Sequence, residues 1–166
     1  MIWNKQFKYP NSQRSIKGEY DIKKMLLPSV TTVLNATQPE SKRKSLDKWA
    51  RRVGDDEATR IKELAGRRGT AMHFYLQKHL DPDCKGYVDL TQVGQVAEPM
   101  AKKIIEKGMG DLTEIWGSEV VVYYPGLYAG ATDVVGIYDD SESIVDFKQS
   151  NKPKQRQWID DYFMQL

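Results

Sequence analysis

The sequence predicts an α/β fold of the α+β kind, a short mixed central sheet flanked by helices, with a helical N-terminal part. Apolar residues recur at helical spacing within residues 28–108, whereas the β-branched segments gather in 118–148. At 166 residues with 40% hydrophobic content, the chain is long enough for one domain with its own core. We expect a single domain over 1–166: an extension 1–27, the mainly helical 28–108, and a sheet core with its following helix, 118–166.

The first part of the chain predicts short surface strands and then several helices. Residues 1–27 mix aromatics and lysines without a sustained period, as in one or two short strands. Ser29 is expected to cap a helix that begins after Pro28. Further helices are expected at 41–54, at 55–65 with Gly66 as its end, from Thr70 to Leu80, and at 93–107 after a loop at 81–89.

Residues 41–54 predict a basic amphipathic helix. Its apolar stripe contains Leu46, Trp49, Ala50 and Val53. Its other faces carry Lys42, Arg43, Lys44, Lys48, Arg51 and Arg52. A solvated face is the usual reason for such a charge run, and a phosphate-binding surface is the alternative.

A hairpin is expected at 130–148, where two β-branched segments flank a polar turn. The strands are expected at 131–138 and 143–148, joined by the turn 139–142. A two-residue loop would set Asp133 opposite Asp146, and a four-residue loop would set it opposite Lys148. In both registers the three charged groups share one face, because residues two apart in a strand point the same way. Apolar residues occur on both faces, so we expect both to be buried.

Charged groups in such an apolar hairpin require partners, because burying a charge is costly. One interpretation is a structural ion pair between aspartate and lysine. The other is a site for a hard divalent cation, with oxygen ligands from Asp133, Asp146 and the Phe147 carbonyl. In that case Lys148 would act on the attacking water or on the phosphate.

Composition excludes several classes of protein. The single cysteine, Cys84, excludes an internal disulfide and any four-cysteine zinc or iron–sulfur site. No apolar run approaches the roughly 20 residues of a membrane span, and no signal-peptide core is visible, so we expect an intracellular, cytoplasmic protein with no membrane partner. The net charge of +2 is too small to indicate a nucleic-acid partner by itself.

The motifs resemble those of a known family. Gly130-x-x-Asp133, a hydrophobic strand and then Asp146-x-Lys148 resemble the PD-(D/E)XK nuclease superfamily, in its RecB-like exonuclease branch. The run 146–154 looks similar to that of the mitochondrial genome maintenance exonuclease and its phage and bacterial relatives. Three upstream pieces are similar and fall in the same order: Pro28-Ser-Val-Thr31, Gly69-x-x-x-His73 and Glu119.

The resemblance implies a restriction-endonuclease-like core and a catalytic Mg²⁺ or Mn²⁺. The expected metal ligands are Asp133, Asp146, Phe147, His73 and Glu119, with Lys148 as the catalytic cation. The expected nucleic-acid-binding residues are Ser29, Thr31, Lys44, Lys48, Arg52, Lys152, Lys154, Gln157 and Tyr162.

Together with the residues, the resemblance predicts a magnesium-dependent exodeoxyribonuclease that hydrolyses single-stranded DNA, with DNA that is single-stranded or has a free end as its partner. A structure-specific endonuclease or junction resolvase is the alternative within nucleases. A non-catalytic nucleic-acid-binding domain and a structural domain with ion-paired charges are the alternatives from other classes. Members of the family usually continue into further strands, so we expect a second copy of the chain or further C-terminal residues to complete the sheet.

Overall fold

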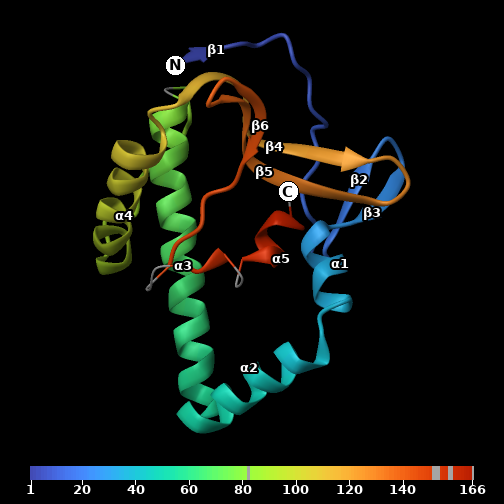
Figure 1. Cartoon of the computed structure of the whole chain (residues 1–166), viewed down its shortest axis with the longest axis vertical. Helices are drawn as coiled ribbons and strands as arrows, with labels where there is room; N and C mark the ends of the chain where they lie inside the picture. The colour runs from blue at the N-terminus through green and yellow to red at the C-terminus, as the bar shows by residue number, and fades with distance from the viewer. Residues whose placement is uncertain (82, 151–153, 157–158, 166) are drawn as a thin grey trace. The chain divides into compact units, whose positions relative to one another are not determined.

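The computed structural model describes residues 1–81, 83–150, 154–156 and 159–165 of the chain. Its elements are β1 (Ile2–Trp3), β2 (Glu19–Ile22), β3 (Met25–Pro28), α1 (Val30–Ala36), α2 (Glu40–Val53), α3 (Asp55–Leu80), α4 (Gln92–Gly108), β4 (Leu112–Tyr124), β5 (Tyr128–Tyr138), β6 (Ser141–Val145) and α5 (Asp160–Phe163) (Figure 1). A four-stranded mixed sheet has the order β1-β4-β5-β6, and β2 and β3 form a two-stranded sheet. The predicted α+β fold is confirmed.

The chain divides into two compact units. The sheet unit comprises Met1–Ala36 and Ile105–Leu166, and the helical unit comprises Thr37–Ile104. Segments from both ends of the sequence therefore meet in the sheet unit. There the N-terminal β1 runs parallel to β4, with Ile2 opposite Glu114.

The long β4–β5 hairpin forms the centre of the sheet unit. Its turn is closed by a hydrogen bond from the Leu127 N–H to the Tyr124 carbonyl (3.1 Å), and Gly126 has the positive φ (75°) that this turn needs. β4 begins six residues before the predicted strand 118–124, at Leu112. Two register shifts interrupt its pairing with β5, between Leu112 and Glu114 and between Ile115 and Gly117. Such bulges break the alternation of side chains that would have revealed the strand in the sequence.

The core of the sheet unit lies between the two hairpins. The short strands expected within residues 1–27 are confirmed, and β2 and β3 pack against β4 and β5 rather than lying only on the surface (Figure 1). The buried cluster consists of Tyr20, Ile22, Leu27, Val121 and Ala129. On β5 and after β6, Val134 is 0% exposed and Phe147 is 8% exposed, but Ile144 is 38% exposed. The prediction that both faces of the β5–β6 hairpin are buried is therefore wrong at Ile144, because β6 is an edge strand.

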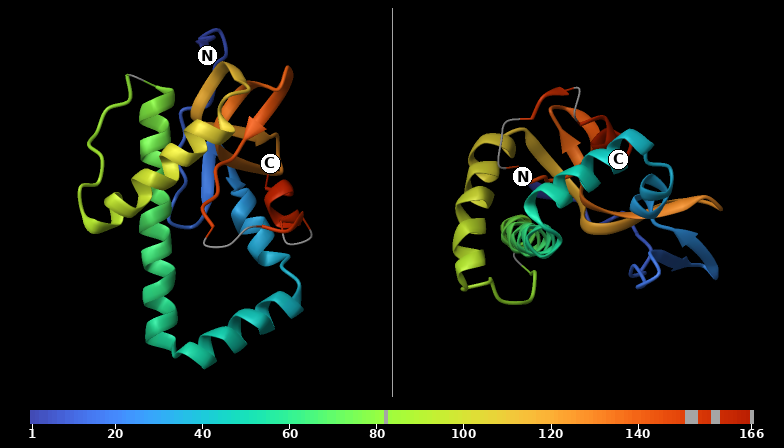
Figure 2. Two further views of the ribbon diagram at one scale, coloured as in Figure 1. Left: turned by 60° about the vertical axis from the view of Figure 1, so that its left-hand side comes forward. Right: turned by 90° about the horizontal axis from the view of Figure 1, so that it is seen from below.

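In the helical unit, one predicted helix boundary is wrong. The sequence predicted two helices separated at Gly66, whereas α3 runs without a break from Asp55 to Leu80 (Figure 2). A glycine in a helix costs only about 1 kcal/mol relative to alanine, which is too little to end a helix whose second half is buried. That second half carries the buried residues Ala71, Met72, Leu76 and Leu80.

The other helices lie close to their predicted positions. α1, α2 and α4 confirm the helices expected after Ser29, at 41–54 and at 93–107. Pro99 lies inside α4, in its first half. Of the helix expected after the sheet core, the described residues contain only the short α5, and Trp158 and Leu166 lie outside the described residues. Among the helices that the structure describes, none combines the length and apolar character needed to cross a bilayer.

Candidate functional site

A two-residue turn fixes the register of the β5–β6 hairpin. Asp139 and Asp140 have φ angles of 49° and 56°, the pair of positive values that a type I′ turn requires. The Asp139 N–H donates to the Asp111 carbonyl (3.0 Å), which ties the turn to the segment before β4. The predicted two-residue loop is confirmed, and the turn over 139–142 with its four-residue register is wrong. Aspartate tolerates the left-handed conformation, so the shorter turn is accessible.

This register brings three carboxylates to neighbouring positions of the sheet. Val134 pairs with Val145, the last residue of β6, and Asp146 follows it directly, so Asp146 leaves the strand next to the position of Asp133. On the other side of β5, Glu119 lies between the paired positions Ser118–Val134 and Val120–Thr132, which sets it opposite Asp133. Carboxylate oxygens of Glu119 and Asp133 lie within 4.8 Å of each other. We call Glu119, Asp133 and Asp146 the carboxylate row.

Asp133 is the central member of the carboxylate row and is held firmly. Asp133 is only 9% exposed, and its Oδ2 accepts a hydrogen bond of 2.5 Å from the backbone N–H of Phe147. The predicted strand 143–148 is therefore too long at its end. β6 stops at Val145, and beyond it the Asp133 side chain takes the Phe147 N–H that a strand would give to a backbone carbonyl. A carboxylate has about four acceptor positions, so this bond uses only part of its capacity.

Asp146 and Lys148 form an ion pair, as in the first of the two interpretations that the sequence left open. The Lys148 Nζ lies 2.6 Å from Asp146 Oδ2, and the two side chains are 32% and 11% exposed. The lysine ammonium also lies 5.8 Å from the centre of the Tyr162 ring, and the Lys154 Nζ donates to the Tyr162 hydroxyl (3.1 Å). Three of the predicted residues after Asp146 are thus brought together. Of the others, Lys152 and Gln157 lie outside the described residues.

Glu119 has an unusual backbone conformation within a strand. Its φ of 53° lies in the left-handed region, which costs on the order of 1 kcal/mol or more for a residue with a side chain. Such strain is found preferentially where a side chain serves a function. No pattern in the sequence indicates this conformation, because the β-branched residues that follow Glu119 are typical of a regular strand.

The carboxylate row supplies the oxygen ligands that a hard divalent cation prefers. Mg²⁺ and Mn²⁺ bind carboxylate oxygens, and Mg²⁺ commonly uses only one or two of them while keeping several waters. The donor set of the row is all oxygen, so it fits such an ion. His73, the predicted histidine ligand, is half-buried and lies on α3 in the helical unit, and its part in a metal site stays a prediction.

Ser29 lies in a different setting from the one expected of a ligand-binding residue. It is 2% exposed, and its Oγ accepts the N–H of Thr32 (3.1 Å), so its predicted role as a helix cap is confirmed. The Nε of Arg14 donates to the same oxygen (3.0 Å). Thr31 is exposed, and it is therefore the member of the pair that offers surface to a ligand.

The predicted phosphate-binding residues of α2 are exposed. Lys44 pairs with Glu40 (2.9 Å), one turn earlier, and Lys48 and Arg52 lie on the surface of the helix. All of α2 is described, and none of its residues is buried. Its apolar stripe is only half-covered: the ammonium of Lys62 lies 5.8 Å from the Trp49 ring centre.

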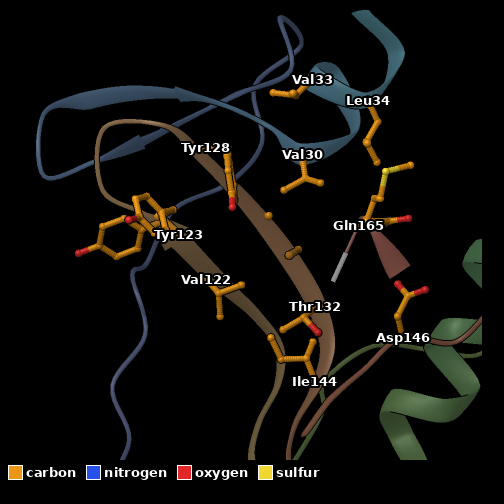
Figure 3. Close-up of a pocket in the computed structure, with 14 residues that line it drawn as sticks. Val30, Val33, Leu34, Val122, Tyr123, Tyr128, Thr132, Ile144, Asp146 and Gln165 are labelled. Atoms are coloured by element: carbon orange, nitrogen blue, oxygen red, sulfur yellow. The ribbon is translucent and has the colours of Figure 1, made fainter. Parts of the chain in front are cut away.

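Sequence reasoning missed a pocket beside the carboxylate row. It has a volume of about 330 Å³ within the sheet unit, and Asp146 forms part of its wall (Figure 3). The other labelled lining residues are Val30, Val33, Leu34, Val122, Tyr123, Tyr128, Thr132, Ile144 and Gln165. They come from α1, both central strands, β6 and the residues after α5, so no local pattern could have grouped them.

Comparison with known proteins adds no assignment. No protein-family model and no curated protein sequence matches this chain.

Proposed function

We propose that this chain is a metal-dependent nuclease that hydrolyses phosphodiester bonds in DNA, acting as an exonuclease on single strands. The observation that carries the proposal is the carboxylate row with Lys148 at its end, 2.6 Å from Asp146. The order of these residues in the sequence also resembles that of the PD-(D/E)XK nucleases, with their restriction-endonuclease-like core.

The first requirement of this chemistry is a bound cation. In the proposal Asp133 and Asp146 are the principal ligands of one Mg²⁺ or Mn²⁺, with Glu119 as a further ligand or a partner of a bound water. The Phe147 backbone and His73 are the remaining proposed donors. When bound, the ion supplies a positive charge for the phosphoryl oxygens and a water of lowered pKa.

The second requirement is a group that orients the attacking water, and Lys148 is proposed for it. Its ammonium, held by Asp146 at 2.6 Å, would orient the attacking water and offset the negative charge that develops on the phosphate. The side chain is 32% exposed, so it can reach a ligand without rearrangement of the backbone. The charge of the carboxylate fixes the ammonium in position, as a rigid site requires.

DNA contact is assigned to the cations and hydroxyls outside the carboxylate row. The proposed phosphate contacts are Thr31, Lys44, Lys48, Arg52 and Lys154, with Tyr162 beside Lys154. Each lysine or arginine that meets a phosphate releases a counterion, which makes binding strongly dependent on salt. In the proposal the cations of α2 bind the phosphates of a single strand with a free end.

One observation also favours a second candidate, a structural domain whose charges are ion-paired. The Asp146–Lys148 ion pair is satisfied without a metal, and an ion pair of this kind occurs in purely structural settings. The two candidates differ in one property, because only the nuclease requires a divalent cation for turnover.

The test is to incubate the protein with end-labelled linear single strands and closed circular single strands, with Mg²⁺ or with chelator. We expect Mg²⁺-dependent, stepwise shortening of linear strands while circles remain intact. Rapid cutting of circles would favour an endonuclease or junction resolvase instead. Binding without any turnover would favour a non-catalytic nucleic-acid-binding domain, and Lys148→Ala serves as the control for a contaminating nuclease.

A further inference from the structure

The pocket beside the carboxylate row has the size and character of a small-ligand site. Its volume of about 330 Å³ is at the lower end of the range for such sites, which are mainly apolar with a few placed polar groups. Aliphatic side chains of α1 form one wall, and Val122 and Ile144 from the sheet form another (Figure 3). Thr132, Asp146 and Gln165 are its polar members.

The α1 wall is fixed in place by buried hydrogen bonds. The Ser29 backbone N–H donates to the Gly18 carbonyl (2.7 Å), and the Thr32 hydroxyl donates to the same carbonyl (3.0 Å). Ser29 also bridges to Ala129 on β5. These contacts tie the start of α1 to β5 and to Gly18 before β2, so this wall of the pocket is preformed and needs little ordering on binding.

One end of the pocket is aromatic and exposed. Tyr124 and Tyr128 are 58% and 41% exposed, and their ring centres lie 6.0 Å apart. The ammonium of Lys23 lies 5.9 Å from the ring centre of Tyr123, which also lines the pocket. Aromatic rings beside cations are the usual means of holding single-stranded nucleic acid, with bases on the rings and phosphates on the charges.

The other end of the pocket is the proposed reaction centre. Figure 3 shows Tyr128 and Asp146 at opposite ends, and Asp146 is at once a lining residue and the partner of Lys148. A ligand that fills the pocket therefore has one end beside the carboxylate row. Among ligands of a nuclease, a nucleotide has the matching parts: a flat apolar base and a phosphate.

We infer that this pocket receives one unpaired base of the bound strand, with Tyr128 as its aromatic wall and the adjoining phosphate directed towards Asp146 and Lys148. The inference rests on the proposed function and specifies its substrate. A base within a duplex is paired at its edge and stacked on both faces, so it must be extruded before it can enter such a pocket. The pocket thus gives a physical reason for a preference for single strands.

The test measures binding by fluorescence anisotropy in metal-free buffer, with the shortest labelled single strand that the protein holds. A series of strands lacks one base at a time, leaving an abasic site at each position in turn. We expect one position at which removal of the base weakens binding about tenfold, since stacking of one base on an aromatic ring contributes on that scale. Removal at the other positions should change binding about twofold or less.

Three variants locate that base in the pocket. Tyr128→Leu keeps apolar bulk but removes the ring, and Ile144→Trp fills the pocket from the exposed edge strand. Both should weaken binding of the intact strand about tenfold and abolish the position-specific effect of base removal. Tyr87→Leu is the matched control: Tyr87 is 98% exposed in the helical unit, and its loss should leave the position-specific effect intact. Thermal unfolding of each variant checks that it is folded.

The outcomes separate this inference from the proposed nuclease activity. Three results would overturn the base pocket. The first is equal binding of all strands in the abasic series, and the second is no binding of single strands. The third is an unchanged position-specific effect in folded Tyr128→Leu and Ile144→Trp. Magnesium-dependent cleavage with equal binding of all these strands would leave the nuclease proposal in place. A position-specific effect without cleavage would support the pocket and refute the nuclease.

Discussion

Replacing Asp133 by Asn tests whether the carboxylate row is built for a metal or for stability. Asn keeps the shape and can still accept the Phe147 N–H, so the lost contribution is that between a charged and a neutral acceptor, about 1 kcal/mol. The substitution also removes repulsion between Asp133 and Glu119, whose oxygens lie within 4.8 Å. With a dielectric constant of 20 to 80, that repulsion is about 1 to 3.5 kcal/mol, and the exposure of Glu119 favours the lower figure.

The two effects nearly cancel in the absence of metal. We expect the unfolding temperature of Asp133→Asn in chelator to lie within about 4 °C of the wild type, since about 1 kcal/mol corresponds to 2–4 °C at this size. Magnesium at about a hundred times its dissociation constant should stabilise the wild type by about 2.7 kcal/mol and raise its unfolding temperature by roughly 5–10 °C. The variant should show almost none of that rise. Its cleavage should collapse, and its DNA affinity in metal-free buffer should hold or increase.

Differential scanning fluorimetry with and without Mg²⁺ measures both quantities. Asp140→Asn is the matched control, because it makes the same change in an exposed residue of the β5–β6 turn, where Asn is equally suited to the positive φ of 56°. It should keep the full magnesium response. A variant at Asp133 that keeps the magnesium response would refute the ligand assignment. One that unfolds in chelator, or loses DNA binding there, would show that Asp133 is structural.

Three further predictions follow from the same geometry. Asp146→Ala and Lys148→Ala should each abolish cleavage in a folded protein, and a folded variant that cuts at the wild-type rate would exclude that residue from the chemistry. Replacing Lys44, Lys48 and Arg52 of α2 should reduce the slope of log affinity against log salt concentration by about 0.7 for each true phosphate contact. An unchanged slope would mean that the strand runs elsewhere, and neutralising Lys102, Lys103 and Lys107 of α4 is the control. Gly66→Ala should raise the free energy of unfolding by up to about 1 kcal/mol, because no atom lies within 4 Å of the added methyl group and α3 is continuous there; a loss of stability in urea unfolding would argue for a break at Gly66.

Local chemistry was enough to predict much of the fold. The Ser29 cap is confirmed because the capping hydroxyl and the N–H that it accepts are only three residues apart. α2 and α4 are confirmed because their apolar residues recur at the helical period. The Asp146–Lys148 ion pair was one of two interpretations that the sequence left open, and its two side chains meet because residues two apart in an extended chain reach the same side.

Boundaries were wrong where a distant contact outweighs a local preference. Gly66 and Gly69 have weak helix propensity, but each costs too little to interrupt α3, whose C-terminal half is buried. The sequence of Leu112 to Gly117 lacks alternation, and pairing with β5 across two bulges makes it a strand. The end of β6 depends on Asp133, fourteen residues before Phe147.

By itself the sequence predicted that Asp133, Asp146 and Lys148 lie close together, because only two registers of the expected hairpin place all three charged groups on one face. Only the tertiary structure decided between those registers, through the two-residue turn held to Asp111, and only it set Glu119 opposite Asp133. The pocket beside Asp146 was decided entirely by tertiary structure. Its walls come from segments more than a hundred residues apart in the chain, Val30 and Gln165 among them, and no period or spacing within one segment encodes their meeting.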